Sequence, residues 1–150
     1  MTGKQRRVSV SRVINASPAA VFDVLASPAG HATIDGSGQI TAPRPSQPVR
    51  LALGTKFRMD MKQGLPYRIT NTVVEFEENR RIAWRHIGGH VWRYELEPVP
   101  SGTKVTETFD WSTSRTKRFI ELMGYPAKHV PNMERTLERL DDHLTAPRRD

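Results

Sequence analysis

The 150-residue sequence predicts an α+β fold in which an antiparallel sheet of about seven strands packs against one long C-terminal helix. Segments of alternating apolar and polar residues fill the middle of the chain, and the loops between them are too short for parallel crossovers. Near the end, apolar residues recur at helical spacing, which is typical of a helix with one buried face. The length suits a single domain over residues 1–150, with 1–5 and 146–150 as flexible tails.

The N-terminal part predicts one strand and two short helices. Residues 6–15 alternate valine with polar neighbours, as a strand does. The Ser-Pro pairs at 17–18 and 27–28 each join a capping serine to a proline that suits the first helical position. Glycine-rich residues 35–38 end the second helix, and proline-rich residues 42–48 predict a loop.

The middle of the chain predicts an antiparallel meander. Its strands cover residues 55–62, 67–77, 81–87, 90–97 and 103–113. Short turns rich in glycine or proline separate these segments, so each strand pairs with the next along the chain.

The C-terminal part predicts a helix over residues 115–124 and a second helix that opens at Pro131. The second helix carries an apolar stripe because its residues recur at spacings of four, three and four: Met133, Leu137, Leu140 and Leu144. This stripe needs an apolar surface, and the sheet is the partner that the sequence offers.

Composition narrows the range of functions. The chain has no cysteine, which excludes a disulfide scaffold, thiolate metal sites and cysteine nucleophiles. Its net charge is +7, but the basic residues do not interleave with aromatic residues on one face, so we expect no nucleic-acid partner. Neither a secretory signal nor an apolar run long enough for stable membrane insertion is present, which predicts a cytoplasmic protein.

One segment runs from Val13 to Phe22 and contains a Val-x-x-x-x-Pro-x-x-Val-Phe pattern, and a second segment, Thr106 to Trp111, stands before the last helix. Together with the Ser-Pro pair at 27–28, these segments resemble the START-like (SRPBCC) superfamily, in its polyketide cyclase/dehydrase and lipid-transfer branch. The resemblance covers essentially the whole chain. It implies a helix-grip fold, in which a curved sheet wraps around the C-terminal helix and leaves a cavity between them. It does not define the chemistry, because that superfamily includes carriers, receptors, cyclases, hydrolases and chaperone co-factors.

Alternation along the strands predicts which side chains face this cavity. They are mostly aromatic residues and methionines, which suit an apolar ligand but equally suit a plain core. The sheet contributes Met59, Met61, Trp84, Trp92, Phe109 and Trp111, and the helical side contributes Phe119, Met123 and Met133.

Three polar residues share the inward face and are candidate catalytic groups: His86, Tyr94 and Glu107. A buried carboxylate is costly unless it is paired, and a histidine–glutamate pair can act as general base and orienting partner. The alternatives are a structural salt bridge of Glu107 with Arg85, His86 or Arg93, and a register slip that turns Glu107 to water.

His31 and Asp35 lie four residues apart near the expected mouth of the cavity, where they offer polar contacts to a ligand. The alternative is an aspartate that caps a turn beside an exposed histidine. A metal site needs more ligands, and the sequence does not bring His90 or His129 to this pair. We therefore expect no metal, and no other cofactor, since phosphate-loop and dinucleotide motifs are absent.

These observations favour a carrier or sensor that binds an apolar or aromatic small molecule, such as a lipid or a polyketide-like compound. A polyketide cyclase, aromatase or dehydratase that uses one inward acid–base group is the second hypothesis. A protein-interaction module of the same fold is the third. Each of these three hypotheses is compatible with a homodimer.

Overall fold

The computed structural model describes residues 5–36, 40–43, 50–63 and 65–145, with the backbone alone at 40–43, 59–63 and 65–68. The strands are β1 (Arg7–Ile14), β2 (Ile40–Pro43), β3 (Lys56–Gln63), β4 (Leu65–Glu77), β5 (Arg81–His86), β6 (Val91–Val99) and β7 (Gly102–Asp110). They form one antiparallel seven-stranded sheet in the order β1-β7-β6-β5-β4-β3-β2. The predicted α+β fold with a meander is confirmed.

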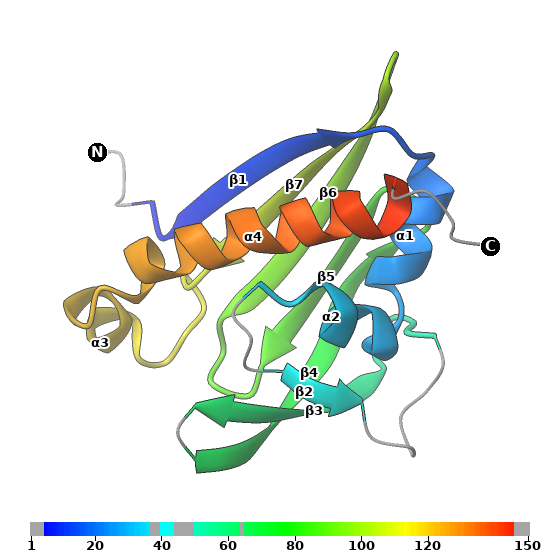
Figure 1. Cartoon of the computed structure of the whole chain (residues 1–150). Helices are drawn as coiled ribbons and strands as arrows, with labels where there is room; N and C mark the ends of the chain where they lie inside the picture. The colour runs from blue at the N-terminus through cyan, green and yellow to red at the C-terminus, as the bar shows by residue number, and fades with distance from the viewer. Residues whose placement is uncertain (1–4, 37–39, 44–49, 64, 146–150) are drawn as a thin grey trace.

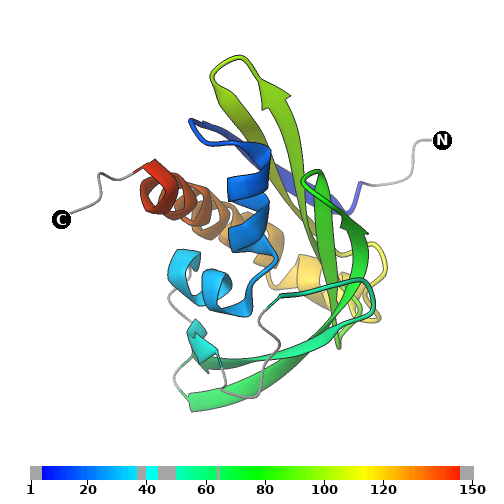
Figure 2. The same ribbon diagram turned by 90° about the vertical axis from the view of Figure 1, so that its right-hand side faces the viewer.

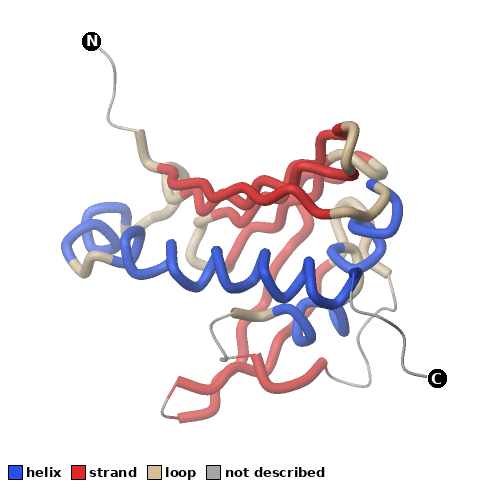
Figure 3. Tube along the Cα trace, turned by 45° about the horizontal axis from the view of Figure 1, so that its top comes forward, coloured by secondary structure: helices blue, strands red, loops and turns tan. Residues whose placement is uncertain are grey.

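The described part of the chain also contains four helices: α1 (Pro18–Leu25), α2 (Pro28–Ile34), α3 (Lys117–Leu122) and α4 (Tyr125–Thr145). Helix α4 lies across one face of the sheet, alongside β1 (Figure 1). The end-on view shows the strands curving around α1, α2 and α4, so that these helices occupy the concave side (Figure 2). In the trace, strands lie above α4, pass behind it and continue below it, as expected of a sheet that curves around this helix (Figure 3). This is the helix-grip arrangement.

Both Ser-Pro signals start helices as predicted. The Ser17 hydroxyl oxygen accepts a hydrogen bond from the Ala20 N–H at 3.2 Å. The Ser27 hydroxyl oxygen accepts one from the Gly30 N–H at 3.3 Å. Each serine thereby satisfies a backbone donor that the first helical turn leaves unpaired.

Two boundaries differ from the prediction. Residues 42–48 were expected as a loop, yet β2 extends over Ile40–Pro43 and pairs with β3; residues 44–48 lie outside the described part. Helix α4 begins at Tyr125 and continues through Pro131, where the sequence predicts a new start. A proline inside a helix removes its own hydrogen bond, but tertiary packing can hold the helix on both sides. Here Tyr125 and His129 stack on each other before the proline, with ring centroids 6.1 Å apart.

Two buried clusters form the core on the concave side. The larger cluster joins α1, the centre of the sheet and the C-terminal half of α4. The smaller cluster contains Phe109, Trp111, Ile120 and Met133. The predicted helical stripe is therefore confirmed, because Met133, Leu137 and Leu140 are all buried.

The segment that follows α2 packs closely against helix α4 at Gly36. A Cβ atom on this glycine would lie 2.4 Å from the backbone oxygen of Asn132 and 2.6 Å from the backbone nitrogen of Thr136. Helix backbone cannot move aside as a flexible side chain can. We therefore expect Gly36→Ala to lower the free energy of unfolding by about 2 kcal/mol, measured by urea denaturation. Unchanged stability would show that α4 shifts freely at this contact.

Candidate functional site

The inner face of the sheet carries aromatic side chains in register across several strands. Trp84 pairs with Trp92 between β5 and β6, and Trp92 pairs with Phe109 between β6 and β7. Trp84 belongs to the larger buried cluster and Trp111 to the smaller one, and Trp92 packs against both. The three tryptophans therefore converge on the side of the sheet that α4 covers, as the alternation predicts.

Glu107 and Tyr94 form a buried polar pair in the middle of this face. They are cross-strand neighbours, and the Tyr94 hydroxyl donates a hydrogen bond to Glu107 Oε1. Glu107 is 3 % exposed, and its Oε2 atom has no hydrogen-bond partner among the described residues. A polar atom buried without a partner is uncommon and costly, which makes this oxygen the most informative atom of the site.

Burial sets the protonation of the pair. Desolvation raises the pKa of Glu107 to about 8, against the opposing effect of the Tyr94 hydrogen bond and with a smaller contribution from the Asp35 charge. Desolvation and then the Glu107 charge raise the pKa of Tyr94 well above its ordinary value. At neutral pH, Glu107 is therefore mostly a neutral carboxylic acid, which can donate a hydrogen bond as well as accept one.

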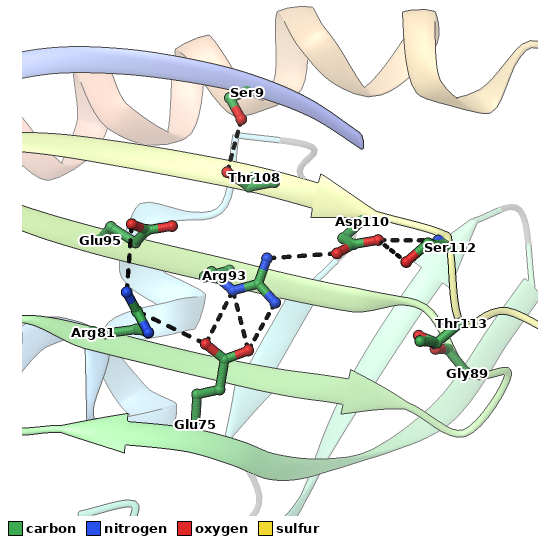
Figure 4. Close-up of polar contacts among 10 residues, drawn as sticks. All are labelled: Ser9, Glu75, Arg81, Gly89, Arg93, Glu95, Thr108, Asp110, Ser112 and Thr113. Carbon is green, nitrogen blue, oxygen red and sulfur yellow. Dashed lines mark hydrogen bonds and ion pairs between the residues drawn. The ribbon is translucent and has the colours of Figure 1, made fainter. Parts of the chain in front are cut away.

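The predicted salt bridge of Glu107 with Arg85, His86 or Arg93 is wrong, and so is the alternative in which a register slip turns Glu107 to water. Arg93 lies on the opposite face of the sheet, where it donates to Glu75 at 2.7 Å and pairs with Asp110 at 3.5 Å (Figure 4). His86 stacks on the His90 ring, with centroids 4.4 Å apart, and its Nδ1 accepts a hydrogen bond from the Gly88 N–H.

The strand register explains why no histidine–glutamate pair forms. Ile82, rather than His86, is the β5 residue aligned with Tyr94 and Glu107. His86 stands at the end of β5, opposite Asn71 of β4. Alternation alone places both residues on one face but does not say how far apart they lie along it.

His31 is a buried residue, so its expected place at a cavity mouth and the alternative of an exposed histidine are both wrong. Its ring stacks on Trp84 at 4.5 Å and meets Phe57 edge-on at 5.5 Å. The ring nitrogen Nε2 lies 2.6 Å from the Leu25 carbonyl oxygen. Burial lowers the pKa of His31 to about 4, so the ring is neutral at pH 7 and donates to that carbonyl. Asp35 follows α2 and is half-buried, near enough to influence the pKa values of Tyr94 and Glu107.

Two further histidines extend the aromatic surface, although neither is among the candidate site residues that the sequence predicts. The His90 ring lies 5.3 Å from Phe109, and the His129 ring of α4 lies 4.6 Å from the same phenyl ring. Burial and the two neighbouring histidines, His86 and His129, lower the pKa of His90 to about 3. Because His129 stands four residues before Met133, extending the apolar stripe backwards through Pro131 would have found it. Within the described residues, no group of three or more acidic or imidazole side chains is arranged to hold a metal.

The helical contributions to the interior need correction. Met133 is buried against Phe109 and Trp111, as expected. Phe119 is 53 % exposed and Met123 is 41 % exposed, so neither lines the interior. Only one face of the short helix α3 is covered, and Ile120 occupies it. The side chains of Met59 and Met61 lie outside the described part of the chain.

A protein family described as polyketide cyclase / dehydrase and lipid transport matches residues 5–145. The chain belongs to this family. An uncharacterized protein of Mycobacterium tuberculosis is 37% identical over 148 residues, which cover 95% of this chain and 66% of that protein. The chain thus spans about two thirds of the length of the curated relatives it matches.

Solved structures agree with the polyketide cyclase / dehydrase fold. A protein from Rhodobacter sphaeroides has a TM-score of 0.74 at 22% identity, covering 97% of this chain and 96% of that one. A polyketide-cyclase-like protein from Corynebacterium glutamicum has a TM-score of 0.57 at 19% identity, covering 95% and 93% of the two chains. At these identities the likeness establishes the fold and leaves the ligand open. In the part of the chain that the structure describes, no helix has the length and hydropathy needed to cross a bilayer.

Two of the hollows in the described part of the chain lie away from the aromatic inner face, and no tryptophan lines either of them. The first, of about 390 Å³, lies between the edge strand β1 and α4 and is lined mainly by polar residues such as Ser9, Arg12 and Glu134. The second, of about 460 Å³, lies at the end of β5. The expected tryptophan-lined cavity therefore coincides with neither hollow.

Proposed function

We propose that this protein binds a small, neutral, mostly aromatic molecule that carries one hydrogen-bonding oxygen, and that it acts as a carrier or sensor. The binding region is the aromatic inner face of the sheet beneath α4. The observation that carries the proposal is the Oε2 atom of Glu107, which is buried beside Tyr94 and has no hydrogen-bond partner among the described residues. The family supports this class of ligand, since its description includes lipid transport and polyketide chemistry.

The protonation of Glu107 indicates what kind of oxygen fits. A carboxylic acid whose Oε1 atom already accepts from Tyr94 keeps its proton on Oε2 and can donate it. A ketone or quinone oxygen in the ligand would accept that hydrogen bond. A ligand carboxylate would instead face the half-buried Asp35, whose charge already disfavours a second negative charge nearby. The proposed ligand is therefore uncharged.

One observation also favours turnover. A pKa of about 8 places Glu107 close to neutrality, where a general acid or base works most effectively. Tyr94 would position the carboxyl group, and the aromatic surface would orient a polyketide-like chain. His86, the third residue of the predicted acid–base set, stands apart from Glu107 and would contact the ligand only near the end of β5.

A matched pair of ligands tests the proposal. 2-Acetylnaphthalene and 2-ethylnaphthalene have nearly the same shape, but only the ketone accepts a hydrogen bond. We expect both to quench the fluorescence of the buried tryptophans, with the ketone bound about five-fold more tightly at pH 6.5, as one net hydrogen bond provides. At pH 9.5 this preference should disappear, because an ionised Glu107 cannot donate.

The Glu107→Gln variant tests whether the change in ligand preference with pH comes from the carboxyl proton of Glu107 or from other effects of pH. The glutamine amide donates at every pH and its oxygen still accepts from Tyr94, so this variant should keep the preference for the ketone at pH 9.5. Glu97→Gln, which changes an exposed residue of β6, should behave as the wild type. Equal affinities for the two ligands at pH 6.5, or no binding of either, would contradict the proposal. A carrier keeps its ligand unchanged, whereas an enzyme converts a bound polyketide and loses that activity in Glu107→Gln.

A further inference from the structure

The second hollow lies on the outer face of the sheet, away from α4 and from Glu107. Thr72 of β4 is aligned with Lys56 of β3 and with Arg85 of β5. Their neighbours along β4, Asn71 and Val73, are buried, so the Thr72 row points to the outer face. The hollow has a volume of about 460 Å³. Its lining consists of Lys56, Thr70, Thr72, Arg85, His86, Ile87, Gly89, Thr113 and Arg115.

The charges of this hollow are unbalanced. It brings together Lys56, Arg85 and Arg115 from three separate segments, and no carboxylate of the described residues lines it. In the described residues, none of these three side chains takes part in an ion pair. Like charges held near one another repel, and an anion between them would remove that repulsion.

Elsewhere on the outer face of the sheet, arginine side chains are paired with carboxylates. Arg93 contacts both Glu75 and Asp110, and Arg81 lies within 3.9 Å of Glu95 and 3.8 Å of Glu75 (Figure 4). Every arginine in that network has a carboxylate beside it. The three cations at the end of β5 are therefore an exception on this face and not a general property of it.

Backbone contacts hold the rim of the hollow in place. The Thr113 hydroxyl donates to the Gly89 carbonyl oxygen at 2.6 Å, and the Arg115 N–H donates to the Gly88 carbonyl oxygen at 3.3 Å. The chain packs so closely here that a Cβ on Gly89 would lie 2.7 Å from the Thr113 carbonyl oxygen. These contacts hold the segment that carries Arg115 against the β5–β6 hairpin, so that Arg115 and Arg85 line the same hollow.

We propose that this hollow binds the phosphate group of a small phosphate ester. A phosphate monoester carries close to two negative charges at neutral pH and offers several acceptor oxygens. The planar guanidinium groups of Arg85 and Arg115 can each donate two hydrogen bonds to such a group. Lys56 adds a third positive charge, and the hydroxyls of Thr70 and Thr72 add neutral donors.

Titration of the 150-residue chain with glycerol 3-phosphate by isothermal calorimetry, in 50 mM salt at pH 7.5, tests the site. We expect saturable binding that Arg85→Gln and Arg115→Gln each weaken about five- to ten-fold. Arg80→Gln is the matched control, because it removes the same charge from an exposed residue in the β4–β5 turn, at the other end of β5. It should change the affinity less than two-fold.

A second arm identifies the source of the phosphate. Co-sedimentation with phosphatidylcholine vesicles that contain 20 mol % phosphatidic acid presents the same group on a lipid surface. Binding to glycerol 3-phosphate with the expected variant pattern assigns a soluble ester. Binding to the vesicles alone, with the same pattern, assigns a lipid headgroup. Binding to neither probe, or equal weakening by Arg80→Gln, would overturn the proposal. All three arginines are exposed, so near-ultraviolet circular dichroism should show each variant folded.

Discussion

Glu107→Gln should stabilise the protein at alkaline pH by several kcal/mol relative to the wild type. In the folded state the pKa of Glu107 is about 8, whereas an unfolded glutamic acid titrates near its ordinary value of 4.5. Between these two pH values the folded state holds a proton that the unfolded state has released. The free energy of unfolding therefore falls as the pH rises, by about 1.4 kcal/mol per pH unit, until Glu107 ionises in the folded state as well.

The measurement is urea denaturation of both proteins at pH 5, 6, 7, 8 and 9. Glutamine has nearly the same shape as glutamate and keeps the hydrogen bond from Tyr94, so the comparison isolates ionisation. The stability difference between variant and wild type should grow from pH 5 to pH 8 and then level off, for a total of roughly 4 kcal/mol. Glu97→Gln removes an exposed carboxylate from β6 and controls for the change in net charge. A difference that stays constant across this range would contradict a neutral Glu107.

Alternation along the strands was sufficient to place several site residues. Tyr94, Glu107 and Trp84 are all buried on the inner face, because a strand sends every second side chain to the same side. The partner of Glu107 could not be obtained in this way. It depends on the register between β6 and β7, which the tight turn between these strands fixes and the alternation within one strand does not give.

Helical parts of the site were harder to predict. His129 was missed because Pro131 indicates a helix start, while in the folded chain packing carries α4 through that proline. Phe119 and Met123 are large apolar residues, a type that is usually buried. The short helix α3 packs against the protein through only one face, however, and Ile120 occupies that face. The sequence predicts His31 at the mouth of a cavity or on the surface. In the structure its ring stacks on Trp84, a residue 53 positions away in the sequence.

The buried ionisable groups on the concave side are mostly uncharged near neutral pH. His31 and His90 have lowered pKa values of about 4 and about 3, so both rings are uncharged. Glu107 has a raised pKa of about 8 and is also mostly uncharged. Three ionisable groups thus lose their charge through burial, in opposite directions of pKa shift. This supports a neutral ligand for the inner face and contrasts with the cationic hollow on the outer face.

Lowering the pH should decrease the free energy of unfolding through the buried histidines, and most clearly through His31. Its pKa is lowered from 6.5 to about 4 by burial, so between these values the unfolded chain binds a proton that the folded chain excludes. Its contribution to stability is complete above pH 6.5 and is lost as the pH falls towards 4. The loss amounts to about 3 kcal/mol, and His31→Gln should avoid it, because the glutamine amide donates to the Leu25 carbonyl without titrating.

Guanidinium or urea denaturation at pH 7, 6, 5 and 4 measures this effect as a difference between variant and wild type. Loss of the stacking contact with Trp84 lowers the stability of His31→Gln by a constant amount, which appears at pH 7. As the pH falls, the gap between variant and wild type should narrow by about 3 kcal/mol in total. His143→Gln, on the exposed side of α4, provides the matched control and should follow the wild type throughout. If the gap at pH 4 equals the gap at pH 7, His31 is protonated in the folded state, and the interior around Trp84 is more polar than its burial indicates.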